Sequence, residues 1–245
     1  VASASIGAVG AAALAWPFID QMNPTTAALE SKVSKMEAGI GTVCFSTGMA
    51  AIASVFVALL RGGDHVVSSS YLFGNTNSLF GTFNTQGYEI TFVDPTDAQN
   101  VARAIKPNTR MVFVETIANP RTQVADLAGI GALCAKHNLI YVVDNTMTSP
   151  YLYRPKRDQA SLVINSLTKY IGGHGTTMGG VIVESGKFPW DNGNFPDMVE
   201  PSRGYHGVRF YETFGDFGYT MKARMEVLRR LDHDDLPLRR VEAEI

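Results

Sequence analysis

The stretch from Ser161 to Gly180 places the tightest constraint on what this chain can fold into. It begins with a short apolar and β-branched run, continues through hydroxyl residues to Lys169, and ends in a series of glycines. The run predicts a buried strand over Leu162–Ser166, and the glycines predict a loop that passes close to a ligand. Most lysines at a loop start are simply solvated. The alternative is a lysine held beside a phosphate-bearing cofactor, where the amine loses water and becomes a nucleophile.

A second apolar run, Leu139–Asp144, ends in a carboxylate. Asp144 and Lys169 each stand at or just beyond the C-terminal end of a predicted strand, which is the edge where open α/β sheets bind ligands. A lysine that forms an imine and an aspartate that faces a pyridinium nitrogen are what pyridoxal 5′-phosphate (PLP) chemistry needs. The pair therefore predicts a PLP site. Asp144 would keep the ring nitrogen protonated, and Lys169 would hold the aldehyde carbon and later move protons.

Predicted strands alternate with predicted helices along most of the chain, which favours an α/β fold with a mostly parallel sheet of about seven strands between helices. Helical patterns cover Gly48–Leu60, Asp97–Ile105, Asp126–His137 and Tyr211–Leu231, and Lys187–Gly207 reads as a loop. The predicted strands are Thr42–Ser46, His65–Ser68, Glu89–Val93, Arg110–Glu115, Leu139–Asp144, Leu162–Ser166 and Gly179–Glu184.

Composition excludes several classes of protein. A length of 245 residues fits one large domain, and a net charge of −2 without a basic stripe argues against a nucleic-acid partner. Cys44 and Cys134 lie in apolar segments without metal-ligand spacing, so we expect free buried thiols and no metal. Val1–Ile19 carries no charge, and we expect an arm that packs on a neighbouring subunit rather than a signal peptide or a membrane span. A cytoplasmic protein is the expectation.

The segment Ser46–Met49 predicts a turn from a strand into a helix. The first amides of a helix have no partner inside it, and they can bind an anion. An ordinary capped helix start explains Gly48 and Met49 equally well when the turn is taken alone. Together with Lys169 and Asp144, the turn favours a phosphate site.

Four separated motifs carry a resemblance to a known family: NPTTAALE at 23–30, FSTGMAAI at 45–52, VVDNT at 142–146 and SLTKYIGGHG at 166–175. In this order they closely resemble the Cys/Met-metabolism group of fold-type-I PLP enzymes, from about Asn23 to about Leu231. The group includes cystathionine lyases and synthases, methionine γ-lyase and the homoserine-ester sulfhydrylases. The resemblance implies the large domain of a fold-type-I PLP transferase, with Lys169 and Asp144 as catalytic and cofactor-binding residues.

The resemblance also implies cofactor contacts for residues whose local sequence alone does not predict a function. Amides matching Gly48 and Met49 bind the phosphate in the family, and hydroxyls matching Ser166 and Thr168 join them. Asn119, which by default is a turn residue before a proline, matches an asparagine that binds the cofactor's phenolic oxygen.

Phe73 matches a position where many relatives carry a tyrosine that stacks on the pyridine ring. A phenylalanine can still stack, but it lacks the hydroxyl that moves protons. A core phenylalanine at a helix start is the alternative.

Both ends of the chain depart from the family pattern. Phe18 and Asp20 stand where relatives carry a tyrosine and an arginine that reach the neighbour's phosphate, and Asp20 would repel that phosphate. Relatives continue into a small C-terminal domain with the arginine that binds the substrate carboxylate, whereas Arg239 matches a structural helix position. The expected layout is an arm over 1–26, a PLP-binding large domain over 27–231, and a remnant over 232–245 that leads toward a small domain largely absent here.

The Gly175-Thr176 pair after His174 resembles the sulfhydrylases, as does the segment 187–207, and Asn75 replaces a cysteine typical of methionine γ-lyases. The resemblance therefore implies an O-acetylhomoserine sulfhydrylase of methionine biosynthesis. Such an enzyme exchanges the acetate of O-acetyl-L-homoserine for sulfide or a thiol, giving homocysteine or methionine, and works as a homodimer or homotetramer. Two alternatives stay open: a cystathionine or methionine γ-lyase activity, and a non-catalytic relative or fragment that serves as a partner subunit.

Overall fold

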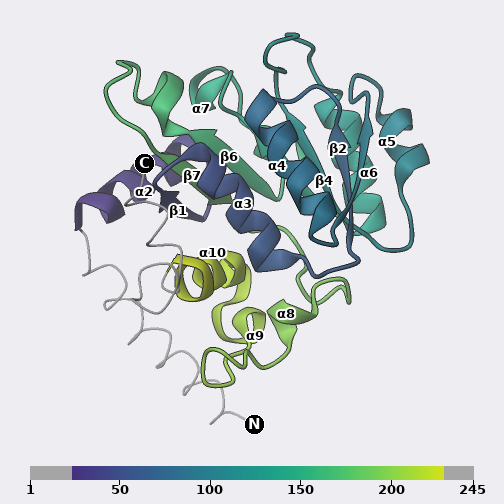
Figure 1. The fold of residues 1–245 in the computed structure, drawn as a ribbon. Coiled ribbons are helices and arrows are strands. Elements are labelled where there is room, and N and C mark those ends of the chain that lie inside the picture. The colour runs from purple at the N-terminus through teal and green to yellow at the C-terminus, as the bar shows by residue number, and fades with distance from the viewer. Residues whose placement is uncertain (1–23, 229–245) are drawn as a thin grey trace.

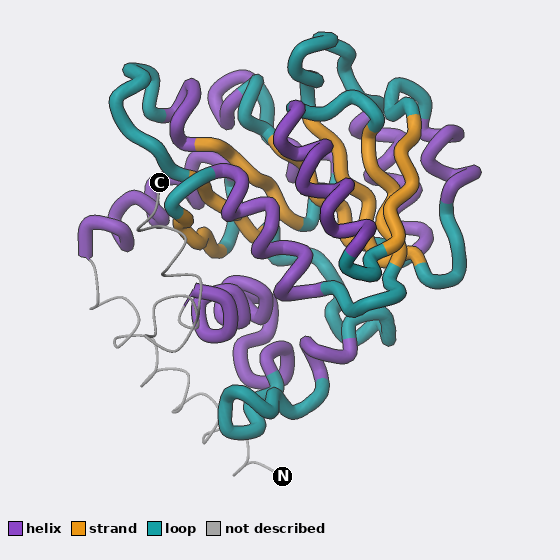
Figure 2. The backbone as a smooth tube through the Cα atoms, viewed as in Figure 1, coloured by secondary structure: helices purple, strands orange, loops and turns teal. Residues whose placement is uncertain are grey.

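The computed structural model describes residues 24–228, which form a sheet with helices on both faces (Figures 1 and 2). The strands are β1 (Gly41–Phe45), β2 (His65–Ser69), β3 (Glu89–Val93), β4 (Thr109–Glu115), β5 (Ile140–Asp144), β6 (Leu162–Ser166) and β7 (Gly180–Glu184). The longer helices are α2 (Pro24–Glu37), α3 (Gly48–Leu59), α4 (Gly74–Thr85), α5 (Ala98–Ala104) and α6 (Leu127–His137). Short helical segments are α7 (Ser149–Leu152), η1 (Pro155–Asp158), η2 (Leu167–Ile171), α8 (Pro196–Val199), α9 (Phe210–Phe214), η3 (Gly215–Phe217), α10 (Gly218–Lys222) and η4 (Ala223–Leu228).

The sheet has seven strands in the order β1-β7-β6-β5-β4-β2-β3. Only β7 runs against its neighbours, β1 and β6, and every other pairing is parallel. The mostly parallel seven-stranded sheet predicted from the sequence is therefore confirmed. Because parallel neighbours end at the same edge, β4, β5 and β6 present their last residues side by side.

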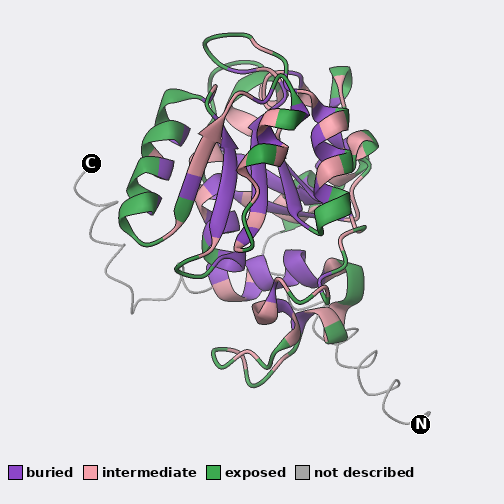
Figure 3. Ribbon diagram, turned by 90° about the vertical axis from the view of Figure 1, so that its right-hand side faces the viewer, coloured by how far each residue is buried: buried purple, intermediate pink, exposed green. Residues whose placement is uncertain are grey.

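Each strand contributes alternate side chains to two apolar layers, as its pleat requires. Phe113, Val142 and Ile164 belong to a cluster that includes α3, α4 and the C-terminal helices. Val112 and Val143 belong to a second cluster, with α5, α6 and one turn of α2. Figure 3 shows that the strands are mostly buried and that the helices turn exposed faces outward. The continuous apolar runs within the central strands, Met111–Val114 in β4 and Ile140–Val143 in β5, follow from this burial on both sides.

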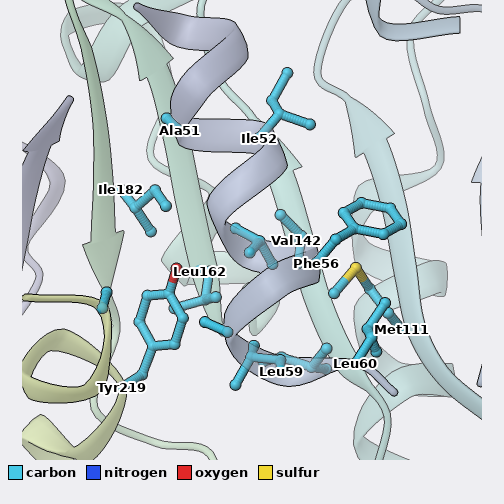
Figure 4. Packing of buried hydrophobic residues seen from close by; sticks show 14 of the residues in the cluster. Ala51, Ile52, Phe56, Leu59, Leu60, Met111, Val142, Leu162, Ile182 and Tyr219 are labelled. Carbon is cyan, nitrogen blue, oxygen red and sulfur yellow. The ribbon is translucent and has the colours of Figure 1, made fainter. Parts of the chain in front are cut away.

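Helix α3 is the centre of the first layer, and Figure 4 shows its buried side chains over the sheet. Phe56 contacts Phe80 with ring centroids 4.9 Å apart, and Phe80 meets Phe113 edge-on at 5.1 Å. Ala51 and Ile52, one turn earlier, are also buried. This packing fixes the axis of α3, so that its N-terminal turn is held over the carboxyl end of β6.

The C-terminal segment differs from the single helix predicted over Tyr211–Leu231. It is divided into α9, η3, α10 and η4, and Gly215 adopts φ 57° at the first break. Buried Glu184 accepts hydrogen bonds from the Tyr219 and Thr220 amides at 3.3 and 2.8 Å, which anchors α10 to the end of β7. The predicted loop over 187–207 likewise contains α8. These segments pack where β7 ends, which is the edge opposite the last residues of β4, β5 and β6 (Figure 1).

Several expectations fall outside the described residues. Phe18, Asp20 and Arg239 lie there, as do most of the predicted arm and the remnant over 232–245, so the domain boundaries stay predictions. Both cysteines are free, and Cys134 is buried whereas Cys44 is only partly so. Within residues 24–228, no helix combines the length and the apolar character that crossing a membrane requires.

Candidate active site

A cavity of about 750 Å³ opens over the edge of the sheet where β4, β5 and β6 end. The parallel pairing of Glu115 with Asp144 and of Asp144 with Ile164 brings these strand ends together. The lining includes every residue that the sequence predicted for the site: Gly48, Met49, Phe73, Asn119, Asp144, Ser166, Thr168 and Lys169. Segments that are far apart in the chain thus meet as the sequence predicted.

The Asp144 carboxylate is fixed through one oxygen and open at the other. Its Oδ1 accepts hydrogen bonds from the Thr146 amide at 2.9 Å and the Thr146 hydroxyl at 2.5 Å. That hydroxyl in turn accepts from the Ser166 amide at 2.8 Å, which links the ends of β5 and β6. No group in residues 24–228 donates to Oδ2. Burial raises the pKa of Asp144 and the Thr146 hydrogen bonds partly oppose it, so a cationic partner at Oδ2 would favour the ionised form.

Lys169 lies in η2, a single π-helical turn whose backbone is non-helical at Lys169 itself (φ −95°, ψ −123°). The Gly172 and Gly173 amides close the turn by donating to the Leu167 and Lys169 carbonyls, each at 2.8 Å. A Cβ at Gly172 would lie 2.6 Å from the Leu167 carbonyl oxygen, so the first glycine of the motif is sterically required. The Lys169 side chain is exposed at the cavity, and its amine has no hydrogen bond or ion pair within the described part of the chain.

The N-terminus of α3 offers free donors to the same cavity. Thr47 caps the helix: its hydroxyl accepts from the Ala50 amide at 3.0 Å and its carbonyl from the Ala51 amide at 3.1 Å. The Gly48 and Met49 amides are left without an acceptor in residues 24–228. A Cβ at Gly48 would lie 2.9 Å from the Ser166 Cβ and 3.1 Å from its hydroxyl oxygen. Two free amides and a serine hydroxyl therefore converge, which suits a phosphate.

Thr168 is placed differently from Ser166. Its hydroxyl donates to the Gly179 carbonyl at 3.3 Å and accepts from the Gly179 amide at 3.1 Å, which ties η2 to the residue before β7. A phosphate contact would have to replace the long bond to the Gly179 carbonyl. The predicted phosphate role of Thr168 stays a prediction, and holding η2 in place is its contact in this structure.

Phe73 and Asn119 stand on the side of the cavity formed by the segments after β2 and β4. Phe73 precedes α4 and its side chain is 39% exposed, so the alternative of a core phenylalanine is wrong. The Asn119 side chain is also exposed and makes no hydrogen bond within residues 24–228. Both side chains are thus free to contact a ligand.

Glu115, the last residue of β4, is a cavity residue that the sequence reasoning missed. It is buried, and one carboxylate oxygen accepts from the Phe73 amide at 2.7 Å while the other accepts from the Asn119 amide at 3.1 Å. Burial and the nearby charge of Asp144 raise the pKa of Glu115 to about 7, although the two amides oppose the shift. The available signal was its position: like Asp144, it ends a predicted core strand.

These groups fit PLP. A free carboxylate oxygen, a free amine, and two free amides with a hydroxyl line one cavity. PLP needs groups of these kinds for its ring nitrogen, its aldehyde carbon and its phosphate. Among residues 24–228, no group of three or more His, Cys, Asp and Glu could hold a metal ion. The prediction that no metal takes part stays a prediction.

Comparison with known proteins agrees with this chemistry. Residues 13–207 match the family described as Cys/Met metabolism PLP-dependent enzyme. The O-acetyl-L-homoserine sulfhydrylase of Leptospira meyeri is 38% identical over 219 residues, which are 86% of this chain and 50% of that protein. The chain thus spans about half the length of this curated relative.

Two solved structures share the fold. A Campylobacter jejuni protein assigned as an O-acetylhomoserine (thiol)-lyase, which contains a pyridoxyl-lysine monophosphate, gives a TM-score of 0.81 at 28% identity over 85% of this chain and 53% of that one. The O-acetylhomoserine sulfhydrylase of Wolinella succinogenes gives 0.75 at 37% identity over 86% and 57%. The resemblance and the fold expected from the sequence are confirmed, and the chain belongs to the Cys/Met-metabolism family of PLP-dependent enzymes.

Proposed function

We propose that the full polypeptide is an O-acetylhomoserine sulfhydrylase, an aminocarboxypropyltransferase that replaces the acetate of O-acetyl-L-homoserine with sulfide or a thiol. The products are homocysteine or methionine, and acetate. The observation that carries the proposal is that the free Lys169 amine and the free Asp144 oxygen open onto one cavity, together with the α3 amides. The name of the Leptospira meyeri relative supports the choice of reaction within the family.

Each residue has a task that follows from its contacts. When bound, PLP supplies an electron sink for the substrate's α-carbon. Asp144 would accept a hydrogen bond from the ring nitrogen at Oδ2 and keep that nitrogen charged. The Gly48 and Met49 amides and the Ser166 hydroxyl would hold the phosphate. The Lys169 amine would hold the cofactor covalently and, once released, would take the α-proton and return it at a neighbouring carbon.

The remaining cavity residues would orient the ring. Phe73 would pack on the ring face, and the Asn119 side-chain amide would donate to the phenolic oxygen. Phe73 has no hydroxyl, so proton transfer falls to Lys169. Thr168 would hold η2 in place. Its hydroxyl could donate to the phosphate only instead of donating to the Gly179 carbonyl.

We further propose that the protein acts as a homodimer or homotetramer in the cytoplasm, with amino-acid and sulfide substrates as its partners. Large apolar side chains exposed on α7 and around the cavity support an interface there: Tyr151 is 89% exposed, Tyr170 63% and Met178 71%. A stable PLP-saturated monomer in light scattering at micromolar concentration would contradict the oligomer.

A parallel assay of the full-length protein tests the reaction. O-acetylhomoserine, O-succinylhomoserine, cystathionine and methionine are supplied separately, each with and without sulfide, and Lys169→Ala serves as the inactive control. We expect sulfide-dependent homocysteine from O-acetylhomoserine as the fastest reaction. Faster cleavage of cystathionine or methionine would replace the proposal with the γ-lyase alternative. PLP binding without turnover of any of the four would favour the non-catalytic alternative.

A further inference from the structure

A single buried carboxylate joins the two loops that carry Phe73 and Asn119. Glu115 ends β4, and its Oε1 accepts from the Phe73 amide at 2.7 Å, across 42 residues of sequence. Its Oε2 accepts from the Asn119 amide at 3.1 Å, in the loop that follows β4. Each oxygen therefore serves one loop, and the two loops cannot shift relative to each other without breaking a hydrogen bond.

Neither loop has an equivalent substitute for this carboxylate. Phe73 precedes α4 without a side-chain cap, and within the described residues its amide has Glu115 as its acceptor. The Asn119 amide likewise has only Glu115, although Ala118 and Thr122 pair within their own turn. An amide that loses a buried acceptor costs free energy, so both loops are held where Glu115 places them.

Asp144 is the one charged group that acts on Glu115 within the described residues: it lies at the end of β5 and repels the Glu115 carboxylate. Lys169 of η2 lines the same cavity. The side chains that α3 and α4 contribute to the lining, Met49, Ile52 and Thr76, are uncharged. A cation bound at Asp144 would offset the nearest negative charge and favour the ionised form of Glu115.

We infer that Glu115 is a positioning residue of the PLP site: its carboxylate clamps the Phe73 and Asn119 loops, sets where their side chains meet the ring, and tightens the clamp when a cation pairs with Asp144. The inference rests on the proposed function. A pKa of about 7 for Glu115 means that the clamp is only partly ionised at neutral pH without a ligand. Cofactor binding should then release a proton, and PLP affinity should rise with pH up to about 7.

The test compares two buried glutamates that each accept two backbone amides. Glu115→Gln keeps the shape, but its NH₂ group cannot accept from the second amide. Glu184→Gln is the matched control, because Glu184 is also buried, accepts from Tyr219 and Thr220, and lies at the opposite edge of the sheet. A loss of general stability should appear in both variants, whereas a positioning effect should appear only in the first.

Two readouts are taken on full-length protein. In the cofactor-free state, NMR amide exchange at Phe73 or Asn119 should lose protection in Glu115→Gln and keep it in Glu184→Gln. On titration with PLP, Glu115→Gln should bind about tenfold more weakly, with a shifted absorbance maximum of the bound cofactor and no rise in affinity toward pH 7. If Glu115→Gln does not fold, wild-type protection factors measured from pH 5.5 to 8.5 decide. They should be constant below about pH 7 and rise above it at both amides, because the pKa of about 7 belongs to the clamped state and loss of the two amide bonds would raise it.

The outcomes separate the inference from the proposed function. Lost protection with unchanged PLP affinity and spectrum would make Glu115 merely structural and overturn the inference, while leaving the reaction intact. Unchanged protection at both amides would also overturn it, as would protection independent of pH in the wild type. Failure of the wild-type protein to bind PLP would refute the proposed function, and the amide exchange would still report whether the clamp exists.

Discussion

Gly48→Ala tests whether α3 approaches β6 as closely as the proposed phosphate site requires. Gly48 and Gly74 are both the first residue of a twelve-residue helix, and neither has a positive φ. A Cβ at Gly74 would meet nothing within 4 Å, whereas one at Gly48 would lie 2.9 Å from the Ser166 Cβ and 3.3 Å from its Cα. The two alanine variants therefore differ in one physical respect, the space for a methyl group.

The structure sets the magnitudes. Replacing a helical glycine with alanine gains up to about 1 kcal/mol through backbone entropy, and Gly74→Ala should show that gain. Gly48→Ala has the same gain but must push the first turn of α3 away from Ser166, and such overpacking costs about 1–3 kcal/mol. Gly48→Ala should thus be less stable than Gly74→Ala by about 1–3 kcal/mol. Displacing one charge-assisted amide bond to a phosphate should also weaken PLP binding by roughly tenfold or more.

Urea unfolding followed by circular dichroism measures the first quantity, and fluorescence titration of the cofactor-free protein with PLP measures the second. Both use the full-length protein. If Gly48→Ala matches Gly74→Ala in unfolding free energy and in PLP affinity, then α3 does not contact the end of β6, and the phosphate assignment is wrong.

Two further predictions concern buried carboxylates. Asp144→Asn keeps the Thr146 contacts but loses the charge facing the ring nitrogen, so turnover should fall on the order of a hundredfold or more while PLP still binds; wild-type turnover in a steady-state assay would rule out the role. Burial raises the pKa of Glu184 from 4.5 to about 7, so the folded state holds this proton more tightly than the unfolded state does. The protonated Glu184 therefore contributes to the free energy of unfolding in full below pH 4.5, and this contribution is lost as pH rises through 7. The free energy of unfolding should fall by up to about 3 kcal/mol over this range. Urea titrations at pH 5 and pH 8 should therefore show a larger loss in wild type than in Glu184→Gln, and equal losses would contradict the burial effect.

The strands and the cavity could be predicted because their signals are local. Each core strand contains a short apolar run. Asp144, the last residue of β5, and Lys169, just after β6, carry the chemistry at the edge where parallel strands end together. The direction of β7 was not fixed by its apolar sequence, since both faces of the sheet are covered and either direction buries the same side chains. Only tertiary packing decides such a choice.

Glu115 could not be assigned from sequence because its partners are amides, which every residue has. Its role depends on the Phe73 loop arriving beside it, 42 residues away along the chain. The broken C-terminal helix has a similar cause, since Gly215 adopts a positive φ and Glu184 holds the start of α10 from another element. The helical spacing of apolar residues over 211–228 indicates which face is buried, but it carries no information about a hydrogen bond to a residue on another element.

We propose that the free Lys169 amine holds PLP at the edge of the sheet where β5 and β6 end. Borohydride reduction of the PLP-loaded full-length protein, followed by proteolysis and mass spectrometry, tests it most directly. We predict a pyridoxyl group on the peptide that contains Lys169, and no labelled lysine in the Lys169→Ala variant. A pyridoxyl group on a different lysine in the wild type, or labelling of Lys169→Ala to the same yield, would contradict the account.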